Sequence, residues 1–286
     1  MNIFYKNTQI PFLIFLLAFA VGCGNLEQEV EIELPQYEPR LVVECYLEPG
    51  NNFQLLLSRS QSYFDPFNAD LMDFAEILED SAQVTIRHNG ESYELVNEIA
   101  TNPPFFNRIF NYNSVDTVPV DYENEFVLEI VTNRGEVIVG RTTLIPPVPI
   151  DSVVVEFDED EELARTLTYF QDDLNADNYY RRQLHLGTLD RIPEQDFTTS
   201  DDFVDDGTIV FGAGYDYEVG DTLIHTIYHI DKVYHDFLES VFGAVEVNGN
   251  PFGQPGAIST NFTSDTNPIG IFTGISFDRI EVIIEK

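Results

Sequence analysis

The chain has 286 residues, with 50 acidic and 14 basic side chains and a formal net charge of −36 at pH 7. Such an acidic surface repels nucleic acid and anionic lipid headgroups, so it argues against nucleic-acid binding. It favours cations, basic or neutral protein surfaces and neutral ligands as partners, although a saline habitat would produce the same charge without any partner.

Residues 1–22 have the pattern of a secretory signal peptide. Lys6 is followed by an uncharged apolar stretch over residues 10–21, and Gly22 precedes Cys23. About a dozen apolar residues are too few for a membrane-spanning helix. Cleavage before a cysteine is the bacterial lipoprotein arrangement, so we predict that Cys23 is lipidated and anchors the chain to a membrane. An ordinary signal peptide followed by a chance cysteine is the alternative.

The segment 23–37 is predicted to be an acidic tether. Glutamates alternate with other residues at Glu27, Glu29, Glu31 and Glu33. Repulsion between these charges favours an extended linker. The same acidic segment could instead serve as an address that directs the lipoprotein to the outer face of the outer membrane.

From residue 38 to residue 149 the sequence predicts an immunoglobulin-like β-sandwich domain. Asn89-Gly90 lies between two alternating segments and favours a type I′ hairpin turn, since both residues tolerate positive φ. Prolines within 145–149 stop the strand pairing and mark the predicted end of the domain. Further strands are predicted at 40–47, 53–60, 126–131 and 137–144.

Residues 150–286 are predicted to form a second β-rich domain with one short helix. Asp231 can cap this helix, apolar residues recur at helical spacing after it, and Gly243 is expected to end it. The last two strands are expected to pair with each other. The predicted strands are 151–157, 179–186, 208–211, 222–230, 270–276 and 279–285. The predicted fold class is therefore mainly β.

The cysteine and histidine residues of the chain give little indication of a reactive thiol or a metal site. Cys45 lies in an apolar run, where a lone cysteine is usually a small buried hydrophobe. His225 and His229 fall on one face of a predicted strand, roughly 13 Å apart at the rise of a strand, which is too far for one metal ion. Hydrogen-bonding roles are favoured for both histidines.

A calcium site is the one cofactor that the sequence suggests. Asp173, Asn175 and Asp177 present oxygen side chains at alternate positions, as the start of a calcium loop does. Asn178 stands where an EF-hand needs glycine, and Leu184 stands where it needs a bidentate glutamate. An Asx-rich turn is therefore favoured over a weak calcium site, and no other cofactor is predicted.

The residues argue against an enzyme more than they argue for a ligand. The sequence has no G-x-S-x-G motif and no glycine-rich phosphate loop, and 50 acidic residues make any one carboxylate uninformative. The absence of tryptophan weakens a carbohydrate-binding function. An enzyme that acts on extracellular glycans or peptides through carboxylates or calcium remains an alternative, as does a structural surface protein.

Several ordered segments together resemble the Bacteroidota lipoprotein family catalogued as domain of unknown function 4249. The resemblance extends over nearly all of the chain after Cys23, although residues 264–268 replace the usual glycine-rich link of the family. The segments that carry it are 37–44 (YEPRLVVE), 142–153 (TTLIPPVPIDSV), 177–181 (DNYYR), 220–223 (GDTL), 250–252 (NPF) and 270–272 (GIF).

This resemblance implies an outer-membrane lipoprotein, often encoded beside a TonB-dependent receptor, with no established activity and no agreed catalytic residues. We therefore expect a non-catalytic accessory that is held in the outer membrane by its lipid, with the cell-surface face favoured over the periplasmic face. Its expected partner is an outer-membrane β-barrel receptor. The Asn250-Pro251-Phe252 loop is a candidate contact for a partner or ligand, although a structural turn is favoured there.

Overall fold

The computed structural model describes residues 38–61, 76–101, 109–160, 162–202, 207–247 and 257–286, which belong to one compact unit from Glu38 to Lys286. The predicted signal peptide (1–22), the tether (23–37) with the Cys23 lipidation site, and the 250–252 loop lie outside these described residues. The predicted mainly β class is confirmed. No helix in the described part of the chain has the length and apolar character needed to cross a membrane.

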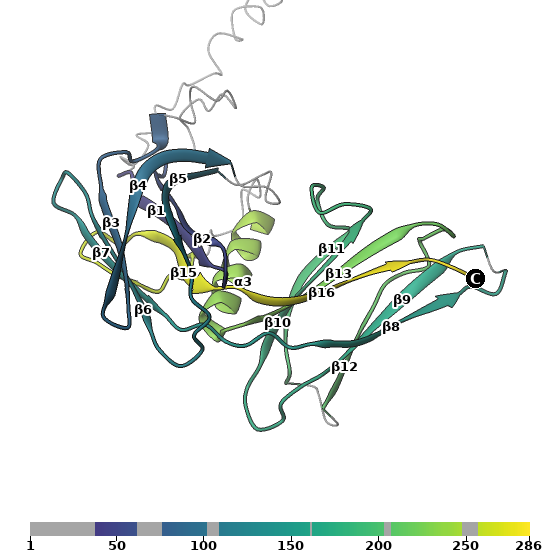
Figure 1. Ribbon diagram of the computed structural model, residues 1–286. Helices are drawn as coiled ribbons and strands as arrows, with labels where there is room; N and C mark the ends of the chain where they lie inside the picture. The colour runs from purple at the N-terminus through teal and green to yellow at the C-terminus, as the bar shows by residue number, and fades with distance from the viewer. Residues whose placement is uncertain (1–37, 62–75, 102–108, 161, 203–206, 248–256) are drawn as a thin grey trace, which may run out of the picture. The chain divides into compact units, whose positions relative to one another are not determined.

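The largest sheet has nine strands in the order β14-β7-β6-β3-β4-β5-β2-β1-β15 (Figure 1). We call it the large sheet. The immunoglobulin-like arrangement of this region stays a prediction. The strands are β1 (Leu41–Leu47), β2 (Asn52–Arg59), β3 (Gln83–His88), β4 (Glu91–Thr101), β5 (Ile109–Thr117), β6 (Phe126–Val131), β7 (Val137–Thr142), β14 (Phe262–Thr263) and β15 (Ile269–Gly274).

Alternation of apolar and polar residues places one face of these strands in the interior. In β1, every second side chain from Leu41 to Leu47 is buried, including Cys45, which confirms its role as a buried hydrophobe. Strand β4 pairs with β3 through its first half and with β5 through its second half, and its pairing register with β5 shifts between Asn97 and Ala100. Figure 1 shows β4 bending along this length.

The two hairpins of the large sheet agree with the sequence pattern. Asn89 and Gly90 have φ values of 49° and 83°, as a type I′ turn between β3 and β4 requires. Gly135, with φ of 80°, lies in the turn that joins β6 and β7. Both turns therefore use residues that adopt positive φ at low cost.

The prediction that the last two strands pair with each other is wrong. Strand β15 pairs in parallel with β1, whereas β16 (Ser276–Ile283) pairs with β13 (Thr222–Ile230) of another sheet. Ile275 alone separates the two strands, and one residue is too short for a hairpin turn. Since β14 and β15 follow residue 149, the large sheet includes strands from both sides of the predicted domain boundary.

Two smaller sheets complete the described chain. One has the order β11-β10-β13-β16, and the other has the order β12-β9-β8. Apolar side chains from both sheets form shared buried clusters between them. Their remaining strands are β8 (Ile150–Phe157), β9 (Ala164–Gln171), β10 (Tyr179–Leu186), β11 (Gln195–Ser200) and β12 (Thr208–Gly212).

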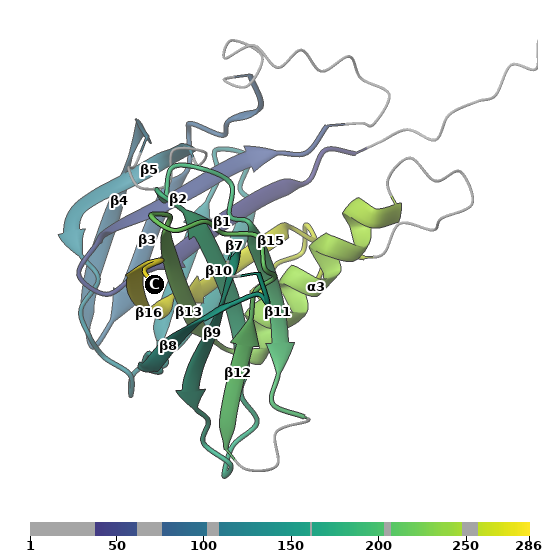
Figure 2. The same ribbon diagram turned by 90° about the vertical axis from the view of Figure 1, so that its right-hand side faces the viewer.

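The predicted helix is present as α3 (Lys232–Val247), which lies beside β11 in Figure 2. The Asp231 carboxylate accepts a hydrogen bond from the Tyr234 backbone N–H at 2.7 Å, which confirms the predicted N-cap. The prediction that Gly243 ends the helix is wrong, because Gly243 does not adopt the positive φ of a terminating glycine and the helix continues to Val247.

Candidate functional site

The predicted calcium residues lie in the turn that follows β9. The Asp173 carboxylate accepts hydrogen bonds from the Asn175 backbone N–H at 3.0 Å and from its side-chain amide at 2.7 Å. These two bonds lower the pKa of Asp173. The Asn178 amide donates to the backbone carbonyls of Asp173 and Ala176, each at 3.0 Å. This geometry is that of an Asx turn, and calcium binding by Asp173, Asn175 and Asp177 stays a prediction.

The two histidines of β13 make separate hydrogen bonds. His225 Nδ1 lies 2.8 Å from the Thr168 hydroxyl, and His229 Nδ1 donates to the Pro146 carbonyl at 2.8 Å. Their placement on one strand agrees with the sequence analysis. Within the described ranges, no three His, Cys, Asp or Glu side chains are grouped closely enough to hold a metal ion.

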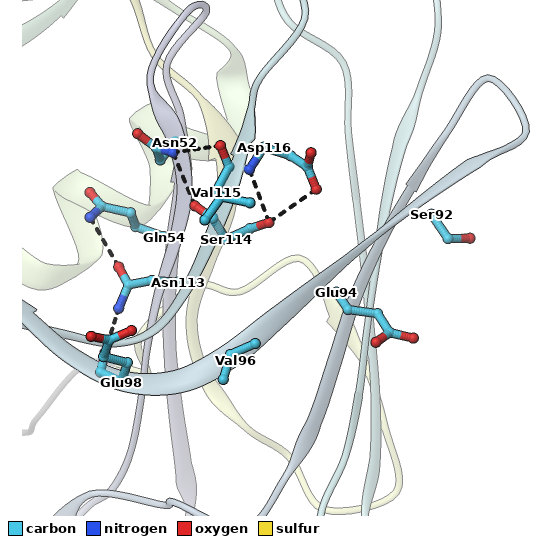
Figure 3. Close-up of a pocket in the computed structure, with 10 residues that line it drawn as sticks. All are labelled: Asn52, Gln54, Ser92, Glu94, Val96, Glu98, Asn113, Ser114, Val115 and Asp116. Carbon is cyan, nitrogen blue, oxygen red and sulfur yellow. Dashed lines mark hydrogen bonds between the residues drawn. The ribbon is translucent and has the colours of Figure 1, made fainter.

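A groove of about 690 Å³ crosses the outward face of three neighbouring strands of the large sheet (Figure 3). Amides, hydroxyls, carboxylates and two valines line it. No local pattern in the sequence predicted this groove. Its residues are Asn52 and Gln54 of β2, Ser92, Glu94, Val96 and Glu98 of β4, and Asn113, Ser114, Val115 and Asp116 of β5.

Hydrogen bonds between the strands hold several groove side chains in place. The Gln54 amide donates to the Asn113 side-chain oxygen at 3.0 Å, and the Asn113 amide donates to the Glu98 backbone carbonyl at 2.5 Å. The Asn52 amide donates to the carbonyls of Ser114 and Val115, each at 3.0 Å. Figure 3 shows both sets of bonds. The groove therefore keeps much of its shape before any partner binds.

Aromatic packing beneath this face supports the groove from the interior. The Phe53 ring lies 4.6 Å, between centroids, from the ring of Tyr93, which packs against the core of the large sheet. The Tyr93 hydroxyl donates to the Glu91 carboxylate at 2.8 Å, and this bond raises the pKa of Tyr93, with smaller contributions from burial and from the charges of Glu91 and Asp116. Tyr93 therefore keeps its proton at neutral pH.

Two valines in the groove are exposed. Val115 is 93% exposed and Val96 is 65% exposed, although both lie within a sheet. Strand register explains their proximity, since Val96 pairs with Asn113, two residues before Val115. Glu94, Glu98 and Asp116 add carboxylates around them, so the groove can offer apolar contact, hydrogen bonds and negative charge to one partner.

Comparison with known proteins identifies a family but not an activity. A family model described as "Domain of unknown function (DUF4249)" matches residues 27–281. No curated protein matches the chain. A solved chain titled "Cytokine receptor complex - Crystal form 1A" aligns over 83% of this chain and 94% of that chain, with 9% identity and a TM-score of 0.27, a value too low to indicate a shared fold. Because the family model spans nearly the whole sequence, the chain belongs to the DUF4249 family.

Proposed function

We propose that this protein is a non-catalytic lipoprotein of the cell envelope that acts as an accessory of an outer-membrane TonB-dependent receptor. Its lipid would be attached at Cys23, with the cell-surface face of the outer membrane favoured. The groove on β2, β4 and β5 would be its contact surface for the receptor. The observation that supports a protein partner most directly is the pair of exposed valines inside a polar groove.

A contiguous apolar patch with a polar rim marks a protein interaction surface, and the groove holds two exposed valines within such a rim. Val115 and Val96 supply the apolar centre, and the surrounding amides supply hydrogen-bond donors and acceptors. Since Asn113 and Asn52 are already held by hydrogen bonds, their ordering would cost little free energy on binding. The carboxylates Glu94, Glu98 and Asp116 favour a partner segment that is neutral or basic.

The anchoring part of the proposal depends on the sequence around Cys23. An apolar stretch over residues 10–21 ends at Gly22-Cys23, and the acidic segment 23–37 would separate the lipid from the folded unit that begins at Glu38. A tethered accessory needs such a spacer in order to reach a neighbouring receptor while its lipid stays in the membrane.

The test is a mild-detergent pull-down of tagged protein from native membranes, followed by mass spectrometry. We expect wild type to retain a stoichiometric β-barrel receptor and Val115→Asp to lose it, because a charge at the centre of the groove opposes apolar contact. Val219→Asp is the matched control, since Val219 is 52% exposed and lies outside the groove. Melting temperatures of both variants should stay close to that of wild type.

Two results would contradict this proposal in different ways. Equal receptor recovery with Val115→Asp and wild type would exclude the groove as the contact surface. Recovery of no receptor with wild type would reject the accessory role and favour an independent binding protein or an enzyme. Cys23→Ser should move the protein from the membrane to the soluble fraction, and a variant that stays with the membrane would contradict lipid anchoring.

A further inference from the structure

A polar layer divides the interior between the two smaller sheets. Thr166 and Thr168 of β9, Arg182 of β10 and His225 of β13 are all buried, and Arg182 is only 1% exposed. Along each of these strands, the inward positions on either side of the layer are apolar. One flanking cluster contains Ala164, Leu184 and Leu223, and the other contains Phe170, Tyr180 and Ile227.

Arg182 enters this layer without a carboxylate to neutralise it. Its Nη1 donates to the Gly212 carbonyl at 2.7 Å, whereas Nε and Nη2 have no hydrogen-bond partner among the described residues. The same part of the structure provides no carboxylate at ion-pair distance, and only the Tyr217 hydroxyl opposes the effect of burial on the pKa of Arg182. Burial lowers the pKa of the Arg182 guanidinium to about 10, so the side chain stays charged at neutral pH.

Two further buried groups in the layer lack partners within the described chain. They are Nε2 of His225 and the hydroxyl of Thr166. Burial, with a smaller contribution from the Arg182 charge, lowers the pKa of His225 to about 4, so its ring is neutral at pH 7. When the Thr168 hydroxyl donates to Nδ1, the neutral ring carries its proton on Nε2.

Strand pairing brings these groups to the same level of the interior. Arg182 pairs with Ile227, two residues from His225 on the same face of β13. Gly212, which accepts the Arg182 bond, pairs with Leu167, and the Ala213 N–H donates to the Thr166 carbonyl at 2.9 Å. A glycine therefore lies beside the guanidinium, and the Phe211 ring lies 5.9 Å from its central carbon.

We propose that the polar layer binds one small monovalent anion, chloride under physiological conditions, between Arg182, His225 and Thr166. These groups can all donate hydrogen bonds: Nε and Nη2 of Arg182, Nε2 of His225 and the hydroxyl of Thr166. A buried cation is costly unless an opposite charge or hydrogen bonds compensate it, and an anion supplies both. Within the described ranges, no carboxylate lies close enough to form an ion pair with Arg182 and compensate its charge.

The first test measures the melting temperature of the protein in sodium chloride and in sodium gluconate at equal ionic strength. An anion that binds only the folded state raises the melting temperature by about 3 °C for each tenfold rise in chloride above its Kd. Arg182→Met should abolish this dependence, because methionine keeps much of the length but removes the charge. Arg87→Met, at an exposed ion pair with Glu129, is the matched control and should retain it.

A second measurement on wild type keeps the inference testable if Arg182→Met does not fold. Crystals grown in sodium bromide should show an anomalous bromide peak beside Arg182 and His225. The inference is overturned if the melting temperature of wild type is the same in chloride and gluconate. It is also overturned if Arg182→Met and wild type show the same chloride dependence, or if the bromide density lies only outside the layer.

Discussion

The buried Asn111 of the large sheet and the polar layer between the two smaller sheets differ in how far their hydrogen-bonding groups are satisfied. In the large sheet, the buried Asn111 side chain accepts from the Leu57 N–H at 2.8 Å and donates to the carbonyls of Leu57 and Glu79 at 2.9 and 3.0 Å. Between the smaller sheets, Arg182 and His225 each leave buried nitrogen atoms without a partner in the described chain. The first arrangement is complete within the fold, whereas the second has capacity for an added ligand.

The largest expected change in stability comes from removing the buried hydrogen bonds of Asn111. Asn111→Ala leaves the Leu57 amide and two carbonyls without their side-chain partner, so we expect the free energy of unfolding to fall by about 3 kcal/mol. Urea unfolding would measure this loss. Asn133→Ala is the control, because Asn133 is exposed in the turn between β6 and β7 and should change stability by less than about 1 kcal/mol. Similar losses of unfolding free energy in both variants would show that the buried Asn111 hydrogen bonds have no special importance for stability.

The next effect concerns the pH dependence that His225 brings to the smaller sheets. Burial and the Arg182 charge lower the pKa of His225 from 6.5 to about 4, so the unfolded chain takes up this proton first as the pH falls. The contribution of the neutral His225 ring to the free energy of unfolding is fully present above pH 6.5 and is lost as the pH falls towards 4. The total loss is about 3 kcal/mol.

His225→Asn should therefore make the stability of the protein less dependent on pH between these two values. His185, whose pKa is also lowered by burial, is present in both proteins, so the difference between them isolates His225. Urea unfolding at several pH values would measure the two slopes. Parallel slopes for the variant and wild type would show that His225 has no such linkage.

The smallest expected effect lies in the apolar core of the large sheet. Cys45 is fully buried, and burial raises the pKa of its thiol, so it should not react with a thiol reagent until the protein unfolds. Cys45→Ala should lower the free energy of unfolding by about 1 kcal/mol, because it removes the buried sulfur atom, which is somewhat larger than a methylene group. Labelling is best followed in a Cys23→Ser background. Rapid labelling of the native protein would contradict the close packing of this core.

Local patterns in the sequence predicted several elements well. Residues 179–186 and 222–230 form β10 and β13 with the predicted bounds, and Asn89-Gly90 and Asp231 have the turn and capping roles that their chemistry favours. Strands β5, β9, β11 and β14 were not predicted. In β5 and β11, Asn113, Ser114 and Thr199 interrupt the apolar alternation on which strand prediction depends, and the inward positions of β9 include the polar Thr166 and Thr168.

Long-range pairing could not be predicted from these patterns. The groove forms because register aligns outward side chains of β2, β4 and β5, which are separated in the sequence by turns and loops. The polar layer similarly depends on Thr168 and His225 meeting across two sheets. No local spacing indicates such contacts, and the partnering of β15 with β1 has no sequence pattern of its own.

The passage of the chain from β15 through Ile275 into β16 also constrains when the protein can fold. Strand β1 is made early, but its parallel partner β15 lies near the C-terminal end of the sequence, and β16 completes the sheet of β13 directly afterwards. Neither sheet has all of its strands until almost the whole chain has emerged from the ribosome. Pairing between such distant segments is slow, which lengthens the time for which strands of the nascent chain stay unpaired. For the exported lipoprotein that we propose, this delay would leave more time for the unfolded chain to be translocated.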